Sequence, residues 1–417
     1  MKLFFTYFSL IRQKLFRLTL LGNFFQHFDQ ALYYFMLPLT APLFFSSKNI
    51  LLAMLWAHLG LASSILFKPL GAYFFGKIAD THGRIKAVSL SLNGLGWSTL
   101  AMVFLPLYSQ VGALAGCLFI ALRAIQSFFA AGETINSSLI LLENASKEKQ
   151  PIAASFYNLS TILGILFSSI CIGFFLSHDT IKQYWRYCYL FGFLTILIAQ
   201  GIRKLTYQDK PITQPLKITL RSWNINNIRI WVQLSLLSGF GYMCFSMVFI
   251  FLPSFFSLIT AQSSQTLIQA NSLLLILDMF ILIGAAALVK KIKIRRLIIL
   301  CLLLTLCFPF CGFAQALKGS LLHILLIRMF FVLIGASFSV AFSCYKTQLV
   351  PYNYRSRILS LSNIIGAQLF GVSSSGLCLG LYYMTNNPWV VVLYTSLLAS
   401  INLAFFIPQF KLMGKKI

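Results

Sequence analysis

Apolar runs long enough to cross a bilayer recur along the whole chain, and they restrict its fold more than any other feature. A helix needs about 20 consecutive apolar residues to span the ~30 Å hydrocarbon layer of a membrane. The composition agrees, because 59% of the residues are hydrophobic and only 10% are charged. A large soluble helical protein would not keep so many runs of this length. The sequence therefore predicts an all-α membrane protein.

The runs predict twelve transmembrane helices in two six-helix halves. Their expected ranges are about 18–45, 50–75, 87–107, 111–142, 152–176, 185–202, 228–258, 265–289, 297–317, 321–345, 356–384 and 389–407. Residues 1–202 would form the N-terminal half, 203–227 a cytoplasmic linker, and 228–417 the C-terminal half. The basic start, residues 1–17, is expected to lie on the inner membrane surface.

The formal net charge of +25 would suit a nucleic-acid partner, but the placement of the bases points to a membrane. Along the predicted topology, 26 of the 33 Lys and Arg residues fall on one side of the bilayer. The opposite side holds Lys48, Lys182, Arg186 and Lys318. This asymmetry follows the positive-inside rule and predicts two cytoplasmic termini. We expect a multi-pass monomer in the inner (cytoplasmic) membrane, with the lipid bilayer and no nucleic acid as partner.

One short stretch between the second and third predicted helices combines glycines, one acid and several bases. It reads Gly71-Ala-Tyr-Phe-Phe-Gly76-Lys-Ile-Ala-Asp80-Thr-His-Gly83-Arg84-Ile-Lys86. Gly83 can take the positive φ of a tight turn, and a plain hairpin would need nothing more. The ordered charges, G-x-x-x-D-x-x-G-R-x-K, resemble the loop between helices 2 and 3 of major facilitator superfamily transporters. With Lys68-Pro69-Leu70-Gly71 just upstream, the stretch looks most like the metabolite:proton symporter branch.

The resemblance implies a cytoplasmic latch in which Asp80, Arg84 and Glu143 hold the two halves shut. Its release would accompany the switch to an inward-facing state. The segment Pro351-Tyr-Asn-Tyr-Arg355 resembles the start of the family's helix 11, and a helix N-terminus would attract the Asp80 carboxylate. The expected gating residues are Gly76, Asp80, Gly83, Arg84, Lys86, Glu143 and Arg355. In the second half Leu288 stands at the offset of Asp80, which argues against a symmetric second latch.

Three of the eight acids fall inside predicted spans, where burying a charge costs at least a few kcal/mol. They are Asp29, Glu133 and Asp278, and we expect proton coupling to use them. The bases inside the spans are Lys68, Arg123 and Arg328. The alternative is that these six groups pair with one another and hold the helix bundle together.

The first predicted helix carries a polar stripe with helical spacing: Gln26, then Asp29 or Gln30, then Tyr33. The segment from Gly22 to Tyr33 resembles the family's helix 1 motif, roughly E-W-Y-D-F-x-L-Y. Asp29 and Tyr33 match that motif, whereas Gln26 stands where the family usually has a glutamate. This departure leaves Asp29 as the proton-site candidate on the helix.

The fourth predicted helix contains Arg123-Ala-Ile-Gln126-Ser-Phe-Phe-Ala-Ala-Gly132-Glu133, which resembles the family's R-x-x-Q-G-x-x-x-G-G-E segment. A guanidinium inside the membrane can clamp a carboxylate with two parallel hydrogen bonds. The alternative role of Arg123 is structural pairing with Glu133 or Asp29. The expected substrate-binding residues are Gln26, Tyr33, Lys68, Arg123, Gln126, Asn158, Arg328 and Asn363.

A weak internal repeat supports two related halves. Arg123 and Arg328 are 205 positions apart, as are Asn158 and Asn363, while Gly76 and Gly284 are 208 apart. Such offsets arise when two six-helix halves are related by an axis along the membrane normal.

The resemblance implies proton-coupled uptake of a small carboxylate-bearing metabolite or zwitterionic osmolyte by alternating access. Members of this branch move proline, betaine or organic acids such as oxoglutarate, citrate and shikimate. A proton-driven exporter, an uncoupled facilitator and a transporter-shaped sensor remain alternatives. The sequence contains no catalytic triad, metal-ligand cluster or phosphate-binding loop, so we expect neither an enzyme nor a cofactor.

Overall fold

The computed structural model describes residues 10–45, 50–177, 181–190, 192–205, 225–260 and 262–413. Within these ranges every regular element is helical. Most of the expected linker at 203–227 and half of the basic start at 1–17 lie outside the described residues. The helices group by their contacts into two compact units. One consists of Met1–Lys217 with Pro351–Leu361, and the other of Ile218–Val350 with Ser362–Ile417.

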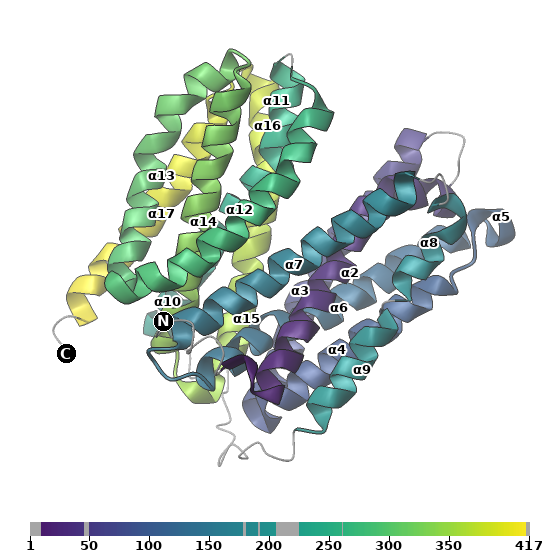
Figure 1. Cartoon of the computed structure of the whole chain (residues 1–417), viewed down its shortest axis with the longest axis horizontal. Helices are drawn as coiled ribbons and strands as arrows, with labels where there is room; N and C mark the ends of the chain where they lie inside the picture. Colours follow the sequence, from purple (N-terminus) through teal and green to yellow (C-terminus); the bar gives the residue numbers. More distant parts are fainter. Residues whose placement is uncertain are drawn as a thin grey trace. The chain divides into compact units, whose positions relative to one another are not determined.

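The first unit is built around a central helix, α6 (Figure 1). Its elements are α2 (Lys14–Phe44), α3 (Ile50–His82), α4 (Arg84–Val103), α5 (Tyr108–Val111), α6 (Leu114–Glu143), α7 (Gln150–Ser177), α8 (Ile181–Tyr189) and α9 (Gly192–Arg203). Helix α6 packs against α2, α3, α4 and α7. The contact with α3 is close, since a Cβ on Gly71 would lie 2.0 Å from the Phe128 carbonyl oxygen. Only a glycine permits this backbone approach.

The first unit also contains a short returning segment from the later part of the chain. It comprises η4 (Tyr352–Tyr354) and the beginning of α15 (Arg355–Gly366). The boundary between the two units falls inside α15, between Leu361 and Ser362. One continuous helix therefore belongs to both units.

The second unit contains two π-helical turns within longer rods. Its elements are α10 (Ile225–Ser246), η3 (Met247–Phe251), α11 (Leu252–Ile259), α12 (Ser264–Lys291), α13 (Ile294–Leu317), α14 (Leu321–Leu349), the end of α15, η5 (Ala367–Val372), α16 (Ser373–Thr385) and α17 (Val390–Met413). Pro253 explains η3, because proline has no N–H to give to the carbonyl four residues earlier. The helix widens there, and the Leu252 N–H reaches back to the Met247 carbonyl.

With the short α5 and η4 left aside, the described helices form twelve rods when α8–α9, α10–η3–α11 and α15–η5–α16 each count as one. The predicted all-α fold with twelve spans is confirmed. Eight described helices are long and apolar enough to cross a membrane by length and composition. The predicted charged loop is shorter than expected, because α3 continues to His82. Gly83, with φ +96°, alone makes the turn into α4.

Candidate functional site

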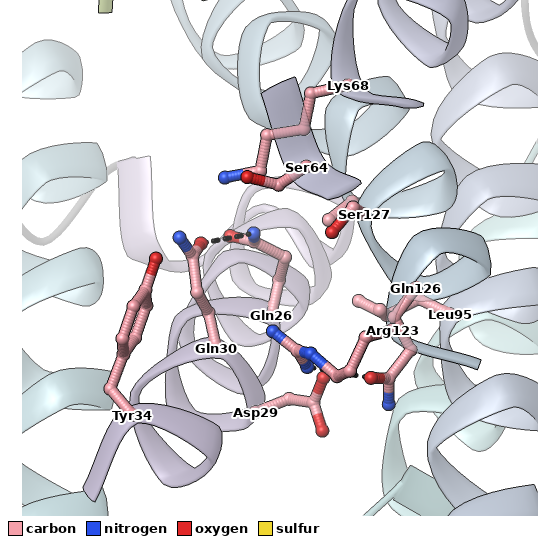
Figure 2. A pocket seen from close by; sticks show the side chains of 11 residues that line it. Gln26, Asp29, Gln30, Tyr34, Ser64, Lys68, Leu95, Arg123, Gln126 and Ser127 are labelled. Atoms are coloured by element: carbon pink, nitrogen blue, oxygen red, sulfur yellow. Dashed lines mark hydrogen bonds between the residues drawn. The ribbon is translucent and has the colours of Figure 1, made fainter. Parts of the chain in front are cut away.

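A polar pocket lies inside the first unit, between α2, α3, α4 and α6 (Figure 2). The residues that line it are Gln26, Asp29, Gln30, Tyr34, Ser64, Lys68, Leu95, Arg123, Gln126, Ser127 and Ala130. Five of the residues predicted from the sequence therefore share one pocket: Gln26, Asp29, Lys68, Arg123 and Gln126.

Arg123 is oriented by neighbouring side chains and has one donor without a partner. One guanidinium nitrogen, Nη1, donates to Gln126 Oε1 at 2.7 Å, and Gln126 Nε2 donates in turn to Thr99 Oγ1 at 3.0 Å. The guanidinium carbon lies 3.6 Å from the centroid of the Tyr33 ring, a close cation–π contact. Arg123 Nε has no hydrogen-bond partner among the described residues. The side chain is 5% exposed, so it is oriented before any ligand arrives.

Asp29 and Lys68 complete the charges of the pocket. Asp29 is buried, forms no ion pair within 4.0 Å among the described residues, and has an unpartnered Oδ1. Gln26 donates to Gln30 Oε1 at 3.3 Å, which leaves Gln26 Oε1 unpartnered. With two bases and one acid, the pocket carries a net positive charge, which favours an anionic ligand.

Tyr33 and Asn158 lie outside the pocket lining. Tyr33 is buried behind Arg123 and stacks on Phe119, with 5.6 Å between the ring centroids. Tyr34 lines the pocket instead, and Ser64 is a second lining residue that the sequence reasoning missed. The sequence did contain a sign of the role of Tyr34, because Gln26, Gln30 and Tyr34 follow one another at i, i+4 and i+8 and so share one helix face. Ser64 had none, since α3 is apolar around it.

The second unit gives Arg328 a different environment from that of Arg123. Arg328 is fully buried and donates from Nε to the Val248 carbonyl at 3.1 Å and from Nη1 to the Leu267 carbonyl at 2.9 Å. Its Nη2 donates to Asn271 Oδ1. Asn271 Nδ2 donates to the Phe249 carbonyl at 3.2 Å. Val248 and Phe249 belong to η3, so Arg328 and Asn271 satisfy carbonyls released by the π-helical turn.

The other predicted residues of the second unit also lie apart from the pocket. Asp278 on α12 is buried and has no ion-pair partner among the described residues. Asn363, near the end of α15, is buried as well. Glu133 belongs to α6 in the first unit but does not line the pocket.

The Asp80 carboxylate caps the N-terminus of α15. Its two oxygens accept the backbone N–H groups of Ser356 and Arg357, each at 3.0 Å. Arg84 Nη1 is 3.7 Å from Asp80 Oδ1. Asp80 lies beyond the predicted membrane segment 50–75. Burial raises the pKa of Asp80 from 3.8 to about 6, although the Arg357 N–H and the Arg84 charge both lower it.

Glu143 joins two arginines beside this cap. The Arg84 guanidinium donates two hydrogen bonds to Glu143, from Nε to Oε2 at 2.5 Å and from Nη2 to Oε1 at 2.9 Å. Arg355 Nη1 donates to the same Oε1 at 2.6 Å. Arg84 also donates to Ser356 Oγ at 3.2 Å and to the Tyr352 carbonyl at 3.3 Å. The structure therefore brings Asp80, Arg84, Glu143 and Arg355 into one charged cluster.

Gly76 marks a close approach between α3 and the start of α15. A Cβ at this position would lie 2.7 Å from Arg357 Cα and 3.2 Å from Arg357 N. Gly284, its counterpart in the sequence repeat, would meet nothing within 4 Å. Lys86, the remaining predicted gating residue, is exposed on α4.

The described residues hold no group of three or more His, Cys, Asp or Glu side chains suited to a metal. The pocket therefore offers hydrogen bonds and charge, the chemistry of binding a small polar solute. The charged cluster offers a contact that can form and break as a unit.

Comparisons with known proteins agree with this fold. The family model for the Major Facilitator Superfamily matches residues 19–375. The alpha-ketoglutarate permease of Escherichia coli (strain K12) is 26% identical over 378 residues, covering 88% of this chain and 82% of the permease. The shikimate transporter of the same strain is 32% identical over 142 residues, which is 33% of this chain and 32% of the transporter.

Solved structures show the same architecture. The proton:xylose symporter XylE bound to 6-bromo-6-deoxy-D-glucose superposes with a TM-score of 0.72 at 16% identity, over 97% of this chain and 96% of the symporter. A bacterial homologue of the iron transporter ferroportin in an outward-facing state gives 0.71 at 15% identity, over 94% of this chain and 98% of the homologue. The chain belongs to the major facilitator superfamily, whose members are multi-pass membrane transporters and not enzymes.

Proposed function

We propose that this protein is a secondary active transporter that takes up a small carboxylate-bearing metabolite together with protons. The observation that carries the proposal is Arg123, a buried and oriented guanidinium that has an unpartnered donor in a polar pocket. Carboxylates are the natural ligands of a guanidinium group, because they can accept two parallel hydrogen bonds from it. The alpha-ketoglutarate permease, which aligns over most of the chain, adds support for an organic acid.

Asp29 would couple the proton to the substrate by electrostatics. While Asp29 is ionised, its negative charge repels a substrate carboxylate that approaches Arg123 in the same pocket. Protonation removes that repulsion and leaves Arg123 and Lys68 as two uncompensated bases. Proton binding and substrate binding then favour each other, and the coupling is reciprocal. Two bases suit a dicarboxylate better than a zwitterionic osmolyte such as proline or betaine.

The cluster of Asp80, Arg84, Glu143 and Arg355 would be the cytoplasmic latch. Asp80 and Glu143 hold the start of α15, a helix that continues into the second unit. Releasing the start of α15 would accompany the opening of the transporter to the cytoplasm. We place the protein in the inner membrane with both termini in the cytoplasm, on the strength of the charge asymmetry.

The test begins with a thermal-shift screen of the purified protein against dicarboxylates, tricarboxylates, amino acids and betaines. A stabilising compound is then used in proteoliposomes with an imposed pH gradient. We expect uphill accumulation that a protonophore abolishes. Asp29→Asn should abolish accumulation but keep substrate exchange, whereas Glu148→Gln, at an exposed cytoplasmic acid, should behave as wild type.

Each alternative has its own outcome in the same vesicles. Uphill uptake at the wild-type rate by Asp29→Asn would remove Asp29 from the mechanism. Uptake that a protonophore leaves unchanged would indicate a facilitator, and an inverted dependence on the pH gradient would indicate an exporter. Ligand binding without flux would indicate a sensor.

A further inference from the structure

Glu133 is an acid that the proposed mechanism does not use, and its surroundings are unusual. The side chain is 0% exposed in the middle of α6, and neither carboxyl oxygen has a hydrogen-bond partner among the described residues. It also forms no ion pair with any described base. A buried carboxylate without partners is very costly, and buried polar groups in folded proteins are almost always satisfied. The Ser137 hydroxyl interacts with this carboxyl group, but one weak donor does not satisfy two carboxylate oxygens.

Two neighbours on α6 present further unpartnered oxygens. Asn136 and Ser137 are three and four residues after Glu133, the spacing that places side chains on one helix face. Both are fully buried. Asn136 Nδ2 donates to the Gly132 carbonyl at 2.7 Å, which fixes the amide and leaves Oδ1 as an acceptor. Asn136 Oδ1 and Ser137 Oγ have no partners.

The unpartnered atoms are all oxygens: Glu133 Oε1 and Oε2, Asn136 Oδ1 and Ser137 Oγ. A proton on Glu133 would supply one donor for Asn136 Oδ1, so a protonated acid is the alternative to a bound cation. Carboxylate, amide and hydroxyl oxygens together are the ligands of a hard cation. A single carboxylate balances one positive charge, whereas Ca²⁺ and Mg²⁺ sites gather more negative charge. We propose that Glu133, Asn136 and Ser137 form a binding site for one Na⁺ ion.

The site lies next to the pocket along α6. Ala130, which lines the pocket, precedes Glu133 by three residues, and Gln126 precedes Ala130 by four. These spacings put all three on one face of α6, so Glu133 lies one turn below the pocket wall.

The test measures the thermal stability of the full-length protein in NaCl, KCl and choline chloride at equal ionic strength. Na⁺ should raise Tm saturably, by roughly 2 °C at ten times its dissociation constant, while the other two salts should not. Glu133→Gln should abolish the shift, and Ser137→Ala should move its midpoint to higher Na⁺. Ser138→Ala is the matched control, because Ser138 is also fully buried with an unpartnered hydroxyl but points to another helix face.

Equal Tm values in the three salts would overturn the proposal and leave Glu133 as a protonated acid. A full Na⁺ shift in Glu133→Gln would overturn it as well. If that variant fails to fold, calorimetric titration of wild type and Ser137→Ala with NaCl decides, and indistinguishable titrations refute the site. No substrate is needed, so the result is independent of whether the transport proposal holds.

Discussion

Replacing Gly76 by alanine tests whether the approach of α3 to α15 holds the charged cluster together. The new methyl group would lie 2.7 Å from Arg357 Cα and 3.2 Å from Arg357 N, and both are backbone atoms that cannot rotate away. The same N–H of Arg357 donates to Asp80 at 3.0 Å. The helices must separate by some tenths of an ångström, which strains both bonds of the Asp80 cap.

The expected magnitude follows from the cost of overpacking. An extra methyl group in a well-packed contact costs about 1–3 kcal/mol, which corresponds to roughly a 5- to 150-fold shift in an equilibrium. Hydrogen exchange of the peptide that covers residues 352–361 should accelerate by a factor in this range, because exchange follows the population of the opened segment. Mass spectrometry of the labelled peptide measures it directly.

Gly284→Ala is the control, because its methyl group would meet nothing within 4 Å. Both substitutions give the helix the same intrinsic gain of about 1 kcal/mol, so the comparison cancels helix propensity. Unchanged exchange at residues 352–361 in Gly76→Ala would refute the reasoning. So would an equal acceleration in both variants.

Three further predictions concern charged side chains. Folding raises the pKa of Asp80 to about 6, so the folded state binds the proton more tightly than the unfolded state does. The stability that this binding contributes is fully present below pH 3.8 and is lost as the pH rises through 6. The difference in unfolding free energy between wild type and Asp80→Asn should therefore fall by up to about 3 kcal/mol from pH 4 to pH 7. Thermal unfolding of both proteins measures this difference, and an increase with pH would contradict the reasoning. Glu143→Gln should lower Tm by several degrees, since it weakens contacts with two arginines worth roughly 2 kcal/mol, whereas Glu148→Gln should leave Tm unchanged. Arg328→Met should lower Tm by leaving Asn271 Oδ1 and the Val248 carbonyl unpaired, yet leave substrate affinity intact. A lost affinity at normal Tm would assign Arg328 to the substrate.

The number and type of helices could be read from the sequence because each apolar run is a local signal. The end of α3 could not, because a cluster of polar residues such as Asp80 and its neighbours is typical of a loop. Those polar residues stay helical to His82, since Gly83 alone supplies the turn. The sixth predicted helix, 185–202, is two described helices, since α8 ends at Tyr189 and α9 begins at Gly192.

The site was partly predictable for a similar reason. Asp29, Lys68 and Arg123 come from three helices, and polar side chains in membrane helices face one another rather than lipid. The repeat suggested that Arg328 resembles Arg123, but equal spacing does not fix equal surroundings. Asn271, which binds Arg328, has Leu66 at the corresponding offset of 205 in the first half. The sequence therefore contained a sign that Arg328 and Arg123 have different surroundings. The carbonyls of η3 that Arg328 and Asn271 bind could not be predicted, because local sequence patterns do not reveal a π-helical turn.

That turn bears on how the two halves should be compared. A π-helical turn accommodates one residue more than an α-helix of the same length, and it rotates the remainder of the same helix by about 100°. Beyond η3 and η5, a constant offset between the halves will therefore pair side chains that point in different directions. Any inference of ancestry or shared role drawn from such alignments needs a gap at Met247–Phe251 and another at Ala367–Val372.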